Sequence, residues 1–336
     1  MDERADIDAA IASQPHWMAQ TARLAAAALP RLRPWRRTET VALIGMGAST
    51  HAGTVWTEAL RAAGQRALNL DASAVAHYPE GYPVADHLVV VSESGRSPEP
   101  IAAVRRLGVA PVVITNEPDS PLARLGSVVV PLGGFQDSGV YTIGYTCTLV
   151  ALAAVARACG VNLGDPGALA GVASAALADY APDAPAVAAA LDGCTVLDIV
   201  GAGTSYGTAQ AAALLFREAA GLATAPYETA QYLHGPMESC GPGRAVWLFG
   251  DGREDGVAAD VRTAGGYVCS YVTTPGPMAS GVHRSSKPVS GYAAAVAEIV
   301  AAQLVAAELA RLRGREAGAF AFPQPDTKLP RPVARR

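Results

Sequence analysis

Lysine is scarce in this chain of 336 residues: among its 26 basic residues only Lys287 and Lys328 are lysines, and the rest are arginines. Charged residues make up only 17% of the chain, and the formal net charge is −4. The absence of a long basic block argues against nucleic acid as a partner. A lysine that persists in so arginine-rich a chain is a candidate for a specific role.

Cysteine and long apolar runs are also in short supply. No C-x-x-C pair occurs, so neither a zinc framework nor a disulfide scaffold is expected, and the pattern is typical of a reducing cytosol. No apolar run of about eighteen residues lacks a charge, so the sequence predicts no membrane span. The N-terminus is acidic from its second residue, unlike a secretory signal, and we expect a cytoplasmic protein. The five widely spaced cysteines are Cys147, Cys159, Cys194, Cys240 and Cys269.

What the chain does contain is a regular alternation of Val/Ile-rich runs with helical patterns. Continuous apolar strands separated by helices predict an α/β fold in which a parallel sheet is covered on both faces. Residues 5–29 have helical periodicity, and Pro15 is expected to split that segment in two because proline removes a helical hydrogen bond. Segments with strand character begin at Thr40, Ala67, His87, Ala110, Ser127, Cys194, Ala245 and Tyr267.

The plan of the chain repeats once. "VALIGMGASTHAG" and "LDIVGAGTSYGTA" both place G-x-G-x-[ST] directly after a strand, about 156 residues apart. Two related α/β units in tandem are the economical interpretation. We expect an N-terminal helical segment at 1–35, a first unit at 36–160, linker helices with a second unit at 161–314, and a tail or lid at 315–336.

The first glycine turn is a candidate anion site. Gly45 and Gly47 end a strand, and Ser49 opens the next helix, so backbone N–H groups and a hydroxyl face the same point. Thr50 stands where the dinucleotide motif G-x-G-x-x-G requires its third glycine, which disfavours a nucleotide-dependent dehydrogenase. A turn that simply packs helix against strand is the alternative.

A second anion site is predicted by "SESGRSPE", residues 92–99. Ser92, Ser94 and Ser97 crowd a turn between a strand and a helix, and Gly95 permits close backbone approach. Hydroxyls together with helix N-terminal amides can hold a phosphate without a lysine. The alternative, an N-cap at Ser97, accounts for one serine and not for three.

These motifs carry a resemblance. A strand followed by S-x-S-G-x-[ST] and a helix, in a tandem pair with H-G-P in the second copy, resembles the sugar isomerase (SIS) domain family. The likeness extends over about residues 36–330. It includes the isomerase half of glucosamine-6-phosphate synthase and the related phospho-sugar deaminases, isomerases and fructosamine deglycases. It implies two flavodoxin-like units, a sugar phosphate as ligand, no cofactor, and a homodimer with a shared active site.

The resemblance also assigns roles to individual residues. Glu218 matches the carboxylate that moves a proton between C1 and C2, and His234, sixteen residues later, matches the ring-opening histidine. Lys328 resembles, by position, the C-terminal lysine that folds over the sugar. Phosphate contacts fall on Ser49, Ser92, Ser94 and Ser97, with Glu93 between them, and substrate-lining positions fall on Val140 and Thr142.

Three departures from the family qualify this assignment. Glu93 stands where the synthase has glutamine, so it points away from phosphate, binds a sugar hydroxyl, or indicates a ligand without phosphate. Leu215 stands where the synthase has a lysine, which removes its imine-forming option. The chain has no Cys at position 2, and we expect no glutaminase activity.

The residues support the same chemistry independently of the family. Glu218 in a largely apolar helix should have a raised pKa suited to proton transfer between adjacent carbons, and the imidazole of His234 in a Gly-Pro loop suits ring opening. The plainer alternatives are a solvated helix glutamate and an ordinary loop histidine. Glu228 fits a helix surface or a sugar contact, and Glu238 a structural role.

We therefore expect an aldose–ketose isomerase or deaminase acting on a hexose phosphate, most simply an amino-hexose phosphate. Two alternatives stay open: a non-catalytic sugar-phosphate sensor, and an enzyme for a non-phosphorylated amino sugar. No metal is expected, because His16, His77, His87 and His283 show no ligand spacing. The sixth histidine, His51, follows the first glycine turn near the anion site, where packing at the helix N-terminus is the alternative role.

Overall fold

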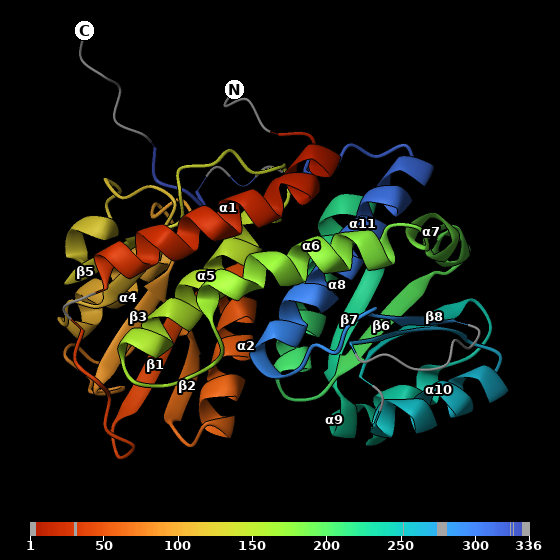
Figure 1. Ribbon diagram of the computed structural model, residues 1–336, viewed down its shortest axis with the longest axis horizontal. Helices are drawn as coiled ribbons and strands as arrows, with labels where there is room; N and C mark the ends of the chain where they lie inside the picture. The colour runs from red at the N-terminus through yellow and green to blue at the C-terminus, as the bar shows by residue number, and fades with distance from the viewer. Residues whose placement is uncertain are drawn as a thin grey trace, which may run out of the picture.

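Two five-stranded parallel sheets form the centre of the protein (Figure 1). The computed structural model describes residues 5–29, 32–250, 252–273, 281–322, 324 and 326–330. The ends of the expected N-terminal segment and tail, 1–4 and 331–336, lie outside these residues.

The first sheet has the order β2-β1-β3-β4-β5, with strands Thr40–Gly45 (β1), Arg66–Asp71 (β2), His87–Val91 (β3), Val112–Thr115 (β4) and Val128–Pro131 (β5). The second has the order β10-β9-β8-β6-β7, with strands Val196–Gly201 (β6), Ala223–Glu228 (β7), Arg244–Phe249 (β8), Tyr267–Val272 (β9) and Val282–Arg284 (β10).

Both sheets share one strand order. Counted from the first strand of each half, it is 2-1-3-4-5, the flavodoxin-like arrangement. The glycine turns also correspond, since Gly47 has φ 53° and ψ −126° and Gly203 has φ 56° and ψ −125°. The predicted α/β fold with parallel sheets is confirmed.

Two strands, β7 and β10, carry too weak a signal to be predicted from the sequence. β7 contains Pro226, which interrupts a strand pattern, yet β7 lies at the edge of its sheet. An edge strand tolerates proline because one side of the strand needs no partner. β10 is only three residues long.

Helices cover both sheets and fill the space between them. In Figure 1, α1 and α6 cross the viewer's side, whereas α2 and α8 lie between the sheets. The helices are Ile7–Ala28 (α1), Ala48–Ala62 (α2), Ala72–Val75 (α3), Pro98–Leu107 (α4), Ile143–Ala158 (α5), Leu169–Tyr180 (α6), Ala184–Asp192 (α7), Thr204–Ala220 (α8), Thr229–Leu233 (α9), Arg253–Thr263 (α10) and Ala294–Leu312 (α11).

The expected break at Pro15 is wrong, because α1 runs through it. Proline at position 15 lacks the N–H that would bond the carbonyl of Ile11, and the Gln14 side chain replaces it, donating from Nε2 at 3.1 Å. Gln14 also donates to Gln303 Oε1 at 2.8 Å and accepts from the Thr146 hydroxyl at 2.9 Å. This buried amide network satisfies the orphan carbonyl and allows the helix to continue.

The segment Gly291–Leu312, which contains α11, is long and apolar enough to cross a membrane by composition. In the fold, 83% of its most apolar window is buried inside the protein. The Tyr292 hydroxyl just before α11 donates to the Leu149 carbonyl of α5 at 2.8 Å. The segment is therefore a core helix of this fold.

Helices α2 and α8 pack as close antiparallel neighbours. A Cβ at Gly207 would lie 2.5 Å from the backbone nitrogen of Val55, and one at Gly47 would lie 4.0 Å from Cδ2 of Leu214. The start of α2 therefore faces the end of α8, and the start of α8 faces the middle of α2. This places the last turn of a second-half helix beside the first glycine turn.

Gly207→Ala tests this contact. The added methyl would clash with backbone, so we expect the free energy of unfolding to fall by about 1–3 kcal/mol in urea denaturation. Gly171→Ala in α6 is the matched control, because no atom lies within 4 Å of its Cβ position. There alanine should leave stability equal or raise it by up to about 1 kcal/mol. Equal effects at both sites would contradict the close packing.

Candidate active site

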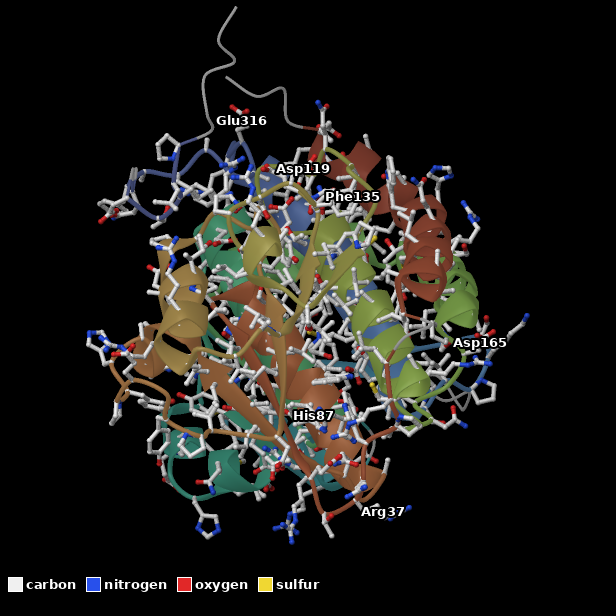
Figure 2. All side chains as sticks on the ribbon, turned by 90° about the vertical axis from the view of Figure 1, so that its left-hand side faces the viewer. Arg37, His87, Asp119, Phe135, Asp165 and Glu316 are labelled. Atoms are coloured by element: carbon white, nitrogen blue, oxygen red, sulfur yellow. The ribbon has the colours of Figure 1, made fainter. Side chains whose placement is uncertain are left out.

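The candidate site lies at the carboxyl edge of the first sheet, where its strands end. Figure 2 shows Asp119 and Phe135, which follow β4 and β5, at one end of the molecule together with Glu316 from the segment after α11. Arg37, three residues before β1, and His87, the first residue of β3, lie toward the other end. The C-terminal segment therefore approaches the carboxyl edge of this sheet.

The four predicted phosphate-binding serines come together there. They line one cavity of about 170 Å³, which we call the cradle. Ser92 and Ser94 follow β3, and Ser49 lies in the first turn of α2; all three are buried. Ser97 holds the N-cap position of α4, but its side chain makes no capping hydrogen bond within the described residues. The Ser97 hydroxyl therefore makes no hydrogen bond to the helix N-terminus that a ligand would have to displace.

Glycine at position 95 is required by the shape of the cradle loop. Gly95 has φ +59°, a conformation that favours glycine, and its Cβ position is 2.0 Å from the Ser120 hydroxyl. Its N–H donates to Ser92 O at 3.0 Å, and its carbonyl accepts from Leu122 N at 3.1 Å. The serines are thus held in a tight turn.

Glu93 lies on the wall between the cradle and a second cavity of about 620 Å³. Its carboxylate accepts from Asn116 Nδ2 at 3.2 Å. Burial raises the pKa of Glu93, and the positive charge of Lys328 opposes that shift. The carboxyl group is therefore held by Asn116, which lines the 620 Å³ cavity, and it lies near enough to Lys328 for that charge to act on it.

Glu218 in the last turn of α8 lies beside the cradle. Together with Ala48 and Tyr141, which also line the cradle, it lines a small gap of about 10 Å³, which we call the passage, and it borders a larger cavity of about 880 Å³. Burial raises the pKa of Glu218 to about 7. Leu215, the position without a lysine, lines the same passage. A carboxyl group that titrates near neutrality thus adjoins the serine cradle.

Lys328 connects these spaces. It lines the cradle, the 620 Å³ cavity and the 880 Å³ cavity, although its side chain is exposed at the surface. The next residue is tied to the cradle loop, because the N–H of Leu329 donates to the carbonyl of Arg96 at 2.9 Å. Lys328 therefore lies where the walls of these three cavities meet.

The predicted lining residues Val140 and Thr142 do not line any of these four cavities. Both side chains are buried, and the Thr142 hydroxyl donates to Asp137. The residue between them, Tyr141, lines both the cradle and the passage, and its hydroxyl bonds Thr148 at 2.9 Å. Tyr141 lines these cavities while its two neighbours do not, because successive side chains in a non-helical segment point in different directions.

Asp137 was not anticipated from the sequence. Its carboxylate accepts the N–H groups of Ser138, Thr142, Ile143 and Gly144 at 2.8–3.1 Å. Burial raises the pKa of Asp137, and these hydrogen bonds counteract it. The N-terminus of α5 is therefore already occupied by a side chain and is not a further anion site.

The structure does not bring His234 to Glu218 within one chain. His234 is exposed at the end of α9, directly after the carboxyl end of β7, in a turn anchored by buried Tyr232, whose hydroxyl donates to Asp198 at 3.1 Å. Glu218 lies at the other end of α8, fourteen residues from its start, and fourteen helical residues span about 21 Å. In Figure 1, α9 and the C-terminal segment lie at opposite ends of the molecule.

Two further glutamates, Glu228 and Glu238, lie on either side of His234 in the sequence. Glu228 caps α9, accepting the N–H of Gln231 at 3.0 Å. Glu238 is exposed in a short 3₁₀ helix. Across the described residues, no group of three or more His, Cys, Asp or Glu side chains is placed to hold a metal ion.

Comparison with solved structures finds the same fold in phosphosugar enzymes. The C-terminal domain of glucosamine-fructose-6-phosphate aminotransferase from Francisella tularensis has a TM-score of 0.80 at 17% identity, covering 94% of this chain and 98% of that one. Glucosamine-6-phosphate deaminase from Thermotoga maritima has 0.74 at 18%, covering 95% and 98%. Tagatose-6-phosphate ketose/aldose isomerase from Escherichia coli has 0.74 at 16%, covering 95% and 96%. No protein-family model and no curated protein sequence matches the chain.

Glu93→Gln should tighten the binding of inorganic phosphate. At pH 8 we expect roughly a tenfold lower Kd by calorimetry, because removing a nearby negative charge relieves a repulsion of order 1–2 kcal/mol. The difference should shrink as the pH falls, since Glu93 then becomes neutral. Glu99→Gln, which changes charge by the same amount in the first turn of α4, should have little effect. Equal affinity in wild type and Glu93→Gln would contradict the placement of this carboxyl group.

Proposed function

We propose that this protein is a sugar-phosphate aldose–ketose isomerase or amino-sugar-phosphate deaminase. The observation that carries the proposal is Glu218, a partly buried carboxyl group with a pKa of about 7, on the wall of a passage that adjoins a cavity lined by four serine residues. The cradle would hold the phosphate group. Glu218 would face the reacting carbons.

The proton transfer follows from these positions. The Glu218 carboxylate removes a proton from the carbon next to the carbonyl of the open-chain sugar, leaving an enediolate or its 2-amino counterpart, whose O1 takes up the proton of the C2 hydroxyl or amino group. It then returns the proton to the adjacent carbon. A pKa near 7 suits both steps, because the same group must accept and release a proton at neutral pH. Serine hydroxyls and the N-terminal amides of α4 hold the phosphate end, and Lys328 covers the sugar.

Ammonia release would follow the same route. Isomerisation of a 2-amino aldose gives an imine at C2, and water hydrolyses that imine to the ketose and ammonia. Leu215 beside Glu218 is apolar, so that position contributes no amine to form an imine with the sugar. The proton shuttle is retained without the nitrogen-transfer chemistry of a synthase.

We further propose a homodimer in which His234 completes the partner's site. His234 is exposed on an anchored turn, whereas the 880 Å³ cavity beside Glu218 is open at the surface and lacks a histidine among its described lining residues. An imidazole supplied from a second copy would protonate the ring oxygen and open the sugar. The equal strand orders likewise support two related tandem units, the first at 36–160 and the second, together with its linker helices, at 161–314.

Glu93 supports a second candidate, an enzyme acting on a non-phosphorylated amino sugar. Its carboxyl group on the cradle wall would bind an ammonium or hydroxyl group as readily as it would repel a phosphate dianion. Assays with matched phosphorylated and free amino sugars, following ammonia release and deuterium uptake at C2, distinguish the two candidates. Binding of hexose phosphates without any turnover would instead support a sensor.

Glu218→Gln should abolish turnover while leaving the fold intact. We expect kcat to fall by about 10²–10⁴-fold with ligand binding retained, because the amide cannot accept the proton. Glu238→Gln, on the exposed 3₁₀ helix, is the control and should match wild type. Ammonia release and C2 proton exchange measure both variants, and surviving turnover in Glu218→Gln would refute the base assignment.

The pH dependence gives an independent check on Glu218. The acidic limb of the wild-type kcat/KM profile should have an apparent pKa of about 7, because only the Glu218 carboxylate can remove the proton. Burial raises the pKa of Glu218 in the folded state, so ionising this group favours the unfolded state. The folded protein therefore loses stability as pH rises from about 4.5 through about 7. Glu218→Gln should therefore be more stable than wild type at pH 8, by about 1–2 kcal/mol.

Mixing Glu218→Gln with His234→Ala tests the shared site. Each variant alone should be inactive. After subunit exchange, hybrid dimers hold one intact site, so activity should return to about a quarter of wild type. No recovery despite hybrids confirmed by native mass spectrometry would contradict the shared site.

A further inference from the structure

Arg96 lies inside the serine loop but turns away from the cradle. It stands between Ser94 and Ser97, yet its Nε donates to Glu117 Oε2 at 2.9 Å. Both side chains are largely covered, with exposed fractions of 12% for Arg96 and 26% for Glu117. Its Nη1 donates to the carbonyl of Pro330 at 3.4 Å. The guanidinium thus joins the loop after β4 to the C-terminal segment.

The backbone of Arg96 contacts the same segment. Its carbonyl accepts the N–H of Leu329 at 2.9 Å, and its own N–H donates to the Ser94 hydroxyl at 3.3 Å. One residue therefore touches a cradle serine on one side and, on the other, both residues that follow Lys328. Since Lys328 is exposed and the tail adds no helix or strand there, these are the described hydrogen bonds that tie residues 328–330 to the body.

We propose that Arg96 is a positioning residue that fastens the C-terminal segment to the phosphate loop and so holds Lys328 over the cradle. The proposal rests on the proposed function for the role of Lys328, whereas the fastening itself does not. Arg96 bonds both Ser94 and the C-terminal segment. Phosphate binding in the cradle and docking of the C-terminal segment therefore favour each other, and this coupling is reciprocal.

The two-lysine composition provides a direct assay of tail seating. A lysine-specific endoproteinase has only two target bonds, after Lys287 and after Lys328. Cleavage after Lys328 removes residues 329–336 and is followed by intact-protein mass spectrometry. The cleavage rate reports how often the C-terminal segment detaches from the body of the protein, because a protease requires a detached, extended segment.

Arg96→Met should speed that cleavage by roughly tenfold, since it removes the ion pair and the Pro330 bond. Arg96→Lys, which keeps the charge, should be intermediate, and Arg105→Met on the exposed side of α4 should match wild type. Inorganic phosphate should slow cleavage of wild type and have little effect on Arg96→Met. Equal cleavage of Arg96→Met and Arg105→Met, with the fold verified by circular dichroism, would overturn the fastening.

Kinetics test whether Arg96 acts through Lys328. Arg96→Met should lower kcat about as much as Lys328→Met, and the double variant should be no slower than Lys328→Met alone. Leu329→Pro, which removes the N–H bonded to Arg96, should lower kcat similarly, whereas Leu329→Ala keeps that N–H and should not. Fully additive losses would refute the coupling. If no sugar phosphate is turned over, the proposed function fails, while the cleavage assay still decides the fastening.

Discussion

The close antiparallel packing of α2 on α8 is the contact on which the rest of this site depends. Gly207 allows the two helices to approach until a side-chain methyl would meet the backbone of Val55. That approach sets the first glycine turn beside the last turn of α8, which carries Glu218. The cradle and the carboxyl group come from different halves of the chain, so neither half alone contains the proposed chemistry.

Three carboxyl groups near this edge illustrate how environment separates similar residues. Asp137 is satisfied by the N-terminus of α5, and Glu93 shares its surroundings with Asn116 and Lys328. Glu218 has burial as the cause of its raised pKa, which leaves its proton close to balance at neutral pH. The group with the fewest fixed partners is the one best placed to exchange a proton, because its pKa is set by desolvation rather than by a competing bond.

The extent to which the fold followed from the sequence varied with the kind of signal. Buried strands such as β1 and β6 were predictable because continuous Val/Ile/Leu runs occur where both faces of a parallel sheet are covered. Edge strand β7 was not predictable, because Pro226 interrupts its strand pattern. The fold tolerates this proline because an edge strand needs no hydrogen-bond partner on one side. At Pro15 the local rule failed because a tertiary network through Gln14 supplied the missing donor.

By itself the sequence determined the serine loop, since Ser92, Ser94 and Ser97 surround a single turn and need only local geometry to converge. It also placed Glu218 on a largely apolar helix, and hence predicted a raised pKa. Only the tertiary structure decided that Glu218 adjoins that loop and that His234 lies far from Glu218, near the other end of α8. It also decided that the side chain of Arg96 bonds the tail and not the cradle. These are contacts between segments far apart in the chain, and they follow from how helices pack and which way they run, which no local pattern encodes.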